Sequence, residues 1–380
     1  MMPDQNEIMS SKPVFDEVTI EKILNDSRLV LRSGVLTDGP YVKKFEQAFA
    51  EYVGTKEAIA VNSGTCSLEI AFRHYGVKGG EVIVPTNTFI ASANTVFFAG
   101  GKPVLADIKE ETLCIDPDDA QKRITPKTRG IMAVHIAGLI CPEINELKEI
   151  CEDHKLFLIE DAAHAHGAMI NGKKAGSLGD VGSFSFYPTK VMTTCEGGMI
   201  TTDDQDLAKT ARLLRGHGVN KETGQAEKFG YNWRMHEISA VVGLHQLEQL
   251  EGFVKKRGQI ARLYDEGLRR IDGVKPLATP PNVRHSYYKY PTYVDDDIDP
   301  VKLAAMLKND FHINTGNVYY PPCHLHKLYR EMFGYREGAL PVSEKVLKRV
   351  ICLPMHVQLT TSDIDRVLSA LAESIPKAHN

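Results

Sequence analysis

Lys190 and Asp161 are the residues whose types and spacing most directly suggest chemistry. Lys190 ends the run GSFSFYPTK, and Asp161 lies 29 positions earlier, at the end of the apolar run LFLIED. A lysine amine can form a Schiff base with an aldehyde, and a carboxylate can keep a pyridine nitrogen protonated so that the ring accepts electrons. Pyridoxal phosphate (PLP) chemistry requires this pair, so we expect a PLP site if both side chains serve one cavity.

Four more residues are candidates for contacting the same cofactor. Gly64 and Thr65, in the run NSGT, follow a predicted strand and open a predicted helix, where free N–H groups and the helix dipole favour a phosphate. Ser185 lies in the strand predicted before the lysine and is placed to donate to that phosphate. His164 is a candidate donor to the cofactor's phenolic oxygen.

Each of these residues also has a structural interpretation. Thr65 and Asp161 are residue types that cap helices, and a lone histidine such as His164 is more often structural than catalytic. Most lysines are solvated, but the flanking run FSFYP and the glycine pair that follows make a surface role less favoured for Lys190. The PLP hypothesis therefore requires that the fold bring these motifs together.

Seven short apolar runs are predicted to form the sheet that positions these residues. They alternate with amphipathic helix patterns such as 66–76 and 141–155, which indicates an α/β fold with a mainly parallel sheet. Ligands of such sheets bind beyond the carboxyl ends of the strands, where Asp161 is predicted to lie. The runs are 57–62, 81–86, 102–108, 130–138, 155–161, 181–188 and 197–204.

The pattern changes after residue 250, which predicts two domains. One or two long helices are expected over 236–271, followed by a tyrosine-rich strand at 286–294 and two helices nearer the C-terminus. We therefore expect a large PLP-binding domain, including the N-terminal segment, at 1–250 and a smaller α+β domain at 251–380.

Composition argues against several classes of protein. The 380 residues are 43% hydrophobic and 25% charged, which is ordinary for a globular protein. A net charge of −4 without a basic run disfavours nucleic-acid binding, and no segment has the length of a membrane span. The N-terminus lacks an apolar signal core, and the seven cysteines lack disulfide spacing, so we expect a reduced, cytoplasmic protein. No histidine pair has further ligands at metal-binding spacing, so no metal is expected.

The chain resembles the DegT/DnrJ/EryC1/StrS family of sugar aminotransferases, which share the fold type I (aspartate aminotransferase-like) architecture of PLP-dependent enzymes. The similar runs span about residues 30 to 371 in the order found in the family. They are LRSGVLTDGPYVKKFEQAFAEYVGTKEAIAVNSGTCSLEIA, VPTNTFIASANTV, FLIEDAAHAHGA, GSFSFYPTKVMTTCEGGMITT, LLRGHGV, GYNWRMHEISAVVGLHQLE, INTGNVYYPPCHLHKLY and CLPMHVQLTTSDIDRVLSAL.

The resemblance implies roles for the cofactor residues. Lys190 matches the Schiff-base lysine, which also moves the proton between substrate and cofactor carbons, and Asp161 matches the partner of the pyridinium nitrogen. Phe89 matches the aromatic residue that stacks on the pyridine ring. His164 occupies a position that is often glutamine and faces the phenolic oxygen. The phosphate cradle matches Gly64, Thr65 and Ser185.

The resemblance also implies a homodimer and a sugar pocket. Asn232 matches a residue that reaches the phosphate in the partner subunit, so the active sites are expected to be shared between two chains. Tyr320, His324 and His217 are the candidates for contacting the sugar. Cys195 stands where the family commonly has glycine, and its side chain is expected to narrow the entrance beside the lysine.

The expected activity is transfer of an amino group from glutamate to a nucleotide-linked ketosugar, at C3 or C4, by a ping-pong mechanism through Lys190. The alternatives are amination of a cyclitol ketone, PLP-dependent sugar dehydration, and a non-catalytic PLP-fold regulator. Dehydratases of the family carry histidine at the lysine position, and a regulator does not require the lysine, so Lys190 disfavours both. The sugar, the nucleotide and the stereochemistry of the new amine stay open.

Overall fold

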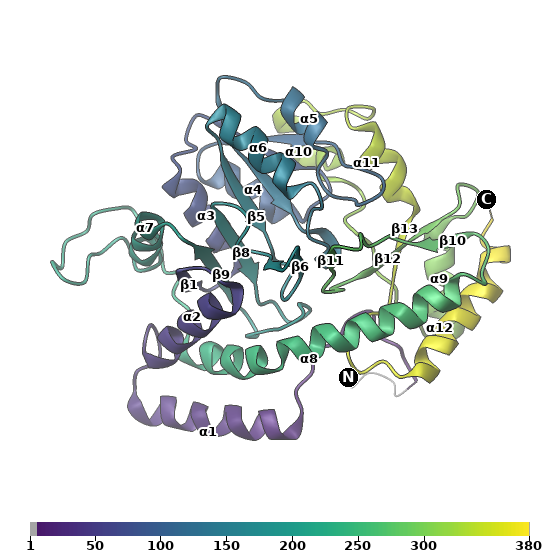
Figure 1. Cartoon of the computed structure of the whole chain (residues 1–380), viewed down its shortest axis with the longest axis horizontal. Coiled ribbons are helices and arrows are strands. Elements are labelled where there is room, and N and C mark those ends of the chain that lie inside the picture. Colours follow the sequence, from purple (N-terminus) through teal and green to yellow (C-terminus); the bar gives the residue numbers. More distant parts are fainter. Residues whose placement is uncertain (1–5, 380) are drawn as a thin grey trace.

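A central seven-stranded sheet forms the middle of the molecule in the computed structural model, which describes residues 6–379 (Figure 1). The strand order is β1-β9-β8-β5-β4-β2-β3, and within this sheet only β9 is antiparallel to its neighbours. The mainly parallel α/β architecture predicted from the sequence is confirmed. The strands are β1 (Glu57–Val61), β2 (Glu81–Pro85), β3 (Lys102–Ala106), β4 (Thr128–Val134), β5 (Phe157–Asp161), β8 (Val181–Ser185) and β9 (Gly198–Thr202).

Each predicted apolar run overlaps one strand of this sheet, and the strands are buried because helices cover the sheet. The clearest difference is in the run 130–138. Here the strand ends at Val134, and Ile136–Gly138 form a 3-10 turn in which Ala137 has a φ of 57°. The chain therefore leaves the sheet four residues earlier than expected, just where the end of β4 lies beside the end of β5.

Helices from residues 40–215 surround the large sheet (Figure 1). They are α2 (Pro40–Val53), α3 (Gly64–His74), α4 (Ile90–Phe98), α5 (Pro117–Lys122), α6 (Ile144–His154) and α7 (Gln205–Arg215). Helix α3 begins directly after β1, and its N-cap is Ser63, whose hydroxyl oxygen accepts a hydrogen bond from the N–H of Cys66. The suggestion that Thr65 is the N-cap was therefore wrong, and the helix starts two residues earlier than that suggestion implies.

A single 32-residue helix, α8 (Glu237–Leu268), connects the two ends of the molecule, and α1 (Glu17–Ser33) packs beside it (Figure 1). The buried carboxylate of Glu237 accepts hydrogen bonds from the N–H groups of Gly39, Tyr41 and Val42. Glu237 thus caps the N-terminus of α2, because the N-cap residue Gly39 has no side chain that could do so. In the described part of the chain, no helix combines the length and apolar character needed to cross a membrane.

The C-terminal part builds its own core. An antiparallel sheet of β10 (Val274–Pro276), β12 (Tyr290–Val294) and β13 (Val350–Leu353) packs with helices around a second hydrophobic cluster, formed by Ile8 and residues 260–378. The proposed division at residues 250 and 251 falls within α8 and stays a prediction. The α-helices that follow α8 in this C-terminal part are α9 (Pro300–Phe311), α10 (Lys327–Phe333), α11 (Pro341–Val346) and α12 (Thr361–Ser374). A small sheet is made of β6 (Met169–Ile170), β7 (Lys173–Lys174) and β11 (Val283–Arg284).

The tyrosine-rich run 286–294 forms a strand only in its second half. In its first half, the N–H of Ser286 donates to the carbonyl of Gly138 (3.1 Å), and the N–H of Lys289 donates to that of Ala137 (3.0 Å). These residues therefore pair with the turn that follows β4 instead of with the C-terminal sheet. The C-terminal part of the chain thus reaches the carboxyl edge of the large sheet.

We predict that Gly198→Ala destabilises the fold at this edge. An added Cβ would clash with the carbonyl group of Ser63 and lie 2.6 Å from the nitrogen of Gly64. Overpacking of this kind costs about 1–3 kcal/mol of unfolding free energy. Gly252→Ala is the matched control: its Cβ meets nothing within 4 Å in α8, so we expect stability to rise by up to about 1 kcal/mol. Chemical denaturation of the two variants tests this, and equal stabilities would contradict it.

Candidate active site

A cavity of about 520 Å³ opens at the carboxyl ends of β4, β5 and β8. Its walls come from the start of α3, the loop before α4, the strand ends, and two C-terminal segments around Tyr288 and Tyr319. Its volume is in the range of pockets that hold a small-molecule cofactor. Seven of the residues predicted from the sequence line it, namely Gly64, Thr65, Phe89, Asp161, His164, Ser185 and Lys190.

Asp161 is the last residue of β5 and is nearly fully buried, with 6% of its surface exposed. One carboxylate oxygen accepts a hydrogen bond from the hydroxyl of Ser92 (2.7 Å), and the other accepts one from the N–H of Ala163 (3.2 Å). The Ser92 hydroxyl in turn accepts from that of Thr88 (2.7 Å). No cation pairs with this carboxylate within residues 6–379, so it keeps acceptor capacity for the N–H of a pyridinium ring.

Lys190 lies five residues beyond β8, and its amine has no hydrogen bond or ion pair to any described residue. The amine nitrogen is 4.7 Å from the centroid of the Tyr288 ring. Burial lowers the pKa of Lys190 to about 8, although the nearby carboxylate of Asp161 opposes this and the Lys289 amine adds to it. A substantial fraction of the amine is therefore neutral near pH 8 and able to attack an aldehyde.

The start of α3 packs tightly against the end of β8. A Cβ on Gly64 would lie 2.8 Å from the Cβ of Ser185, so glycine allows the first turn of the helix to approach this strand. The N–H groups of Gly64 and Thr65 have no partner among residues 6–379, whereas that of Cys66 is capped by Ser63, and the Ser185 hydroxyl lies on the same cavity wall. This donor set fits a phosphate. Together with the carboxylate of Asp161 and the amine of Lys190, these residues fit PLP.

His164 is neutral and already has two partners. Burial, together with the charges of Lys190 and Lys289, holds the pKa of His164 well below its ordinary value. Its Nδ1 accepts from the N–H of Ala137 (3.2 Å), so the ring proton is on Nε2, which donates to the Tyr319 hydroxyl oxygen (2.8 Å). Burial keeps the pKa of Tyr319 well above 10. The hydroxyl proton of Tyr319 is therefore available to an acceptor in the cavity.

The remaining predicted residues lie outside the cavity wall. Tyr320 is 40% exposed and its neighbour Tyr319 points inward instead, while His217 and Asn232 are exposed beyond α7. His324 is fully buried, with Nδ1 2.8 Å from the Thr86 hydroxyl and Nε2 2.9 Å from a Glu344 oxygen. In this chain the structure does not bring these four residues to the cofactor residues.

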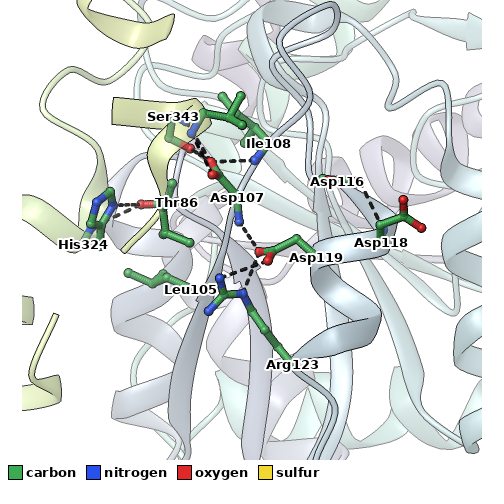
Figure 2. Close-up of polar contacts among 12 residues, drawn as sticks. Thr86, Leu105, Asp107, Ile108, Asp116, Asp118, Asp119, Arg123, His324 and Ser343 are labelled. Carbon is green, nitrogen blue, oxygen red and sulfur yellow. Dashed lines mark hydrogen bonds and ion pairs between the residues drawn. The ribbon is translucent and has the colours of Figure 1, made fainter. Parts of the chain in front are cut away.

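His324 instead helps to anchor the segment that carries Tyr319. Figure 2 shows its contact with Thr86, directly after β2, and a second anchor at Asp107, directly after β3. The Asp107 carboxylate accepts hydrogen bonds from the N–H (2.8 Å) and the hydroxyl of Ser343. The 318–346 segment is therefore fixed over the same carboxyl edge of the sheet that carries Asp161.

Sequence reasoning did not identify Ser92, Tyr288, Lys289 and Tyr319. Ser92 was inside a run used for the family resemblance, and its spacing of one helical turn from Thr88 was the only available signal. The other three enter the site through long-range packing of the C-terminal segments, which no local pattern shows.

Comparison with known proteins assigns this fold to the fold type I class of PLP-dependent aminotransferases. The chain belongs to the DegT/DnrJ/EryC1/StrS aminotransferase family, whose family model matches residues 18–372. The predicted family, PLP dependence and enzyme class are thus confirmed.

Three relatives illustrate the match. GDP-perosamine synthase of Caulobacter vibrioides is 38% identical over 339 residues, which cover 88% of this chain and 90% of that protein. PseC of Helicobacter pylori, an aminotransferase involved in the biosynthesis of pseudoaminic acid, superposes with a TM-score of 0.91 and 28% identity over 98% of this chain and 100% of that chain. The PLP-form of Spr1654 from Streptococcus pneumoniae gives a TM-score of 0.92 and 28% identity over the same fractions, 98% and 100%.

We predict that attachment of PLP to the apo-protein depends on pH with a midpoint near 8, because Lys190 reacts only when its amine is neutral. The ordinary lysine value is 10.5. The Asp161→Asn variant lacks a carboxylate that raises the pKa of Lys190. The midpoint for PLP attachment to this variant should therefore lie at a lower pH than that of the wild type.

The initial rate of appearance of visible absorbance at each pH measures this midpoint. A parallel series with PLP and N-acetyl-lysine methyl ester corrects for titration of PLP itself. A wild-type midpoint close to 10.5, or an upward movement in Asp161→Asn, would contradict the assignment of Lys190.

Proposed function

We propose that this enzyme transfers the amino group of glutamate to a nucleotide-linked 3- or 4-ketosugar by a ping-pong mechanism at the cavity of Lys190. The observation that carries the proposal is that the Lys190 amine, without a hydrogen bond or ion pair among residues 6–379, lies in the same cavity as the carboxylate of Asp161. GDP-perosamine synthase, whose product is a nucleotide-linked aminosugar by name, supports the choice of acceptor.

Each residue has a defined task in this proposal. PLP, when bound, supplies an electron sink for the pair of electrons left by the broken C–H bond. Asp161 accepts a hydrogen bond from the ring N–H and so keeps that nitrogen protonated. Lys190, as a neutral amine, would take the proton from the substrate carbon that bears the nitrogen and return it to the cofactor carbon on the other side of that nitrogen. Phe89 covers one face of the ring.

The phosphate end and the phenolic end of the cofactor require different groups. Gly64, Thr65 and Ser185 offer N–H and hydroxyl donors to the phosphate at the start of α3. At the other end, His164 orients the Tyr319 hydroxyl, which is placed to donate to the phenolic oxygen. His164 then acts through Tyr319, because both of its ring nitrogens already have partners.

We also propose that the working enzyme is a homodimer in which Asn232 reaches the partner's phosphate site. Asn232 and Phe229 lie between α7 and α8, and Phe229 is 96% exposed. Part of this segment projects from the molecule beyond α7 (Figure 1). Large apolar side chains on α1 are exposed as well, among them Val18 (69%) and Leu31 (65%). Such surfaces typically become buried on association. Sedimentation of the holoenzyme as a monomer at micromolar concentration would contradict this.

The substrate assignment is tested by offering the holoenzyme two kinds of ketone. With glutamate as donor, we expect amination of a GDP-linked or dTDP-linked 4-ketosugar, detected as 2-oxoglutarate formed in step with the aminosugar. A free cyclitol ketone such as scyllo-inosose is the competing acceptor. Turnover of the cyclitol alone would replace the ketosugar proposal, and loss of water without transfer of nitrogen would identify a dehydratase.

We predict that Lys190→Ala abolishes the visible absorption band of the holoenzyme and lowers kcat/KM by at least about 10³-fold, since a positioned proton-transfer group contributes about 10²–10⁴-fold. Lys255→Ala removes an exposed lysine of α8 that does not line the cavity and should leave both properties unchanged. An active and yellow Lys190→Ala variant would refute the role of Lys190.

A further inference from the structure

A second lysine, Lys289, lines the same cavity and was not identified by any motif. It directly precedes β12, and its backbone N–H holds it to the turn after β4. Its amine donates to the carbonyl oxygen of Asn317. This bond uses one of the three N–H donors of the ammonium group, and no carboxylate pairs with it within the described residues.

The cavity offers little negative charge to balance Lys289. Besides the two lysines, its titratable side chains are Asp161, His164, Tyr187, Glu196, Tyr288 and Tyr319. His164 is neutral, and the proposed function assigns Asp161 to the ring nitrogen. Burial lowers the pKa of Lys289, which agrees with an incompletely compensated cation. A half-buried ammonium group without a counter-ion is costly unless an anion binds beside it.

The position of Lys289 indicates which anion this is. The amine of Lys289 is 5.8 Å and that of Lys190 is 4.7 Å from the centroid of the same ring, Tyr288. Both amines also line one cavity, and the charge of Lys289 acts on Lys190, so an anion at Lys289 shares the cavity with the carbon that reacts at Lys190. In a 2-amino acid, the carboxylate is bonded directly to that carbon. In a nucleotide-linked ketosugar, several bonds of the sugar ring separate the diphosphate from the keto carbon.

We propose that Lys289 binds the α-carboxylate of the amino donor and of the 2-oxo acid formed from it. Tyr319 forms the floor of this subsite, since its ring lies 5.0 Å from the Lys289 amine. This inference rests on the proposed function and adds to it a binding residue for the first substrate. It assigns recognition of the donor to the C-terminal segment, opposite the phosphate cradle at α3.

The test measures binding of glutarate, an unreactive dicarboxylate, to the full-length PLP holoenzyme by isothermal titration calorimetry. We expect Lys289→Met to weaken glutarate binding by about tenfold or more, since a charge-assisted hydrogen bond is lost. Lys289→Arg should restore most of the affinity. Lys255→Met, at the exposed α8 position, should bind glutarate like the wild type. Retention of the visible band shows that each variant is folded and loaded with PLP.

GDP and dTDP serve as probes for the alternative source of the anion. Their affinities should be the same in Lys289→Met and the wild type. A selective loss of nucleotide affinity would assign Lys289 to the acceptor's diphosphate and overturn the proposal. Unchanged glutarate binding in Lys289→Met, or a wild-type holoenzyme that does not bind glutarate, would overturn it as well.

The experiment is independent of the acceptor. Failure here leaves amination of ketosugars to be decided by the turnover assay. Conversely, an enzyme that binds glutarate through Lys289 and does not aminate a ketosugar would retain the donor subsite and refute the proposed acceptor.

Discussion

The side chain of Asp161 lies buried at the end of a strand, and the proposed site depends on how it is held there. Two hydrogen bonds stabilise it, from Ser92 and from the N–H of Ala163, and no cation forms an ion pair with it among the described residues. A buried charge with this little compensation has a strong preference for a cationic partner. The ring nitrogen of the cofactor is such a partner.

The preceding residue, Glu160, fixes β5 from the opposite face of the sheet. Its carboxylate is fully buried and accepts from the N–H groups of Gly176, Leu178 and Gly179, and it pairs with His135 (2.8 Å). Burial alone would raise the pKa of Glu160, but the hydrogen bonds from His135 and the backbone lower it below its ordinary value. Two consecutive carboxylates thus point to opposite faces, one fixing the strand and the other serving the cavity.

Sequence patterns predicted the sheet and the pair Lys190–Asp161 because both are local. The strands are short apolar runs, and each functional residue follows a strand end. The residues that the C-terminal part contributes to the cavity were not predictable from local patterns. Tyr319 has a φ of 56°, and at this turn Tyr319 lines the cavity while Tyr320 is exposed, an arrangement that no local pattern distinguishes. His324 looked like a site residue, but its partners Thr86 and Glu344 are distant in sequence and make it an anchor.

The most direct measurement of the central claim is to locate the covalently attached cofactor. Reduction of the holoenzyme with borohydride, followed by proteolysis and mass spectrometry, identifies the lysine that carries it. We expect a phosphopyridoxyl group on the peptide that contains Lys190 and none on the peptide that contains Lys289. Attachment at Lys289, or at a lysine outside the cavity, would contradict the account of this site.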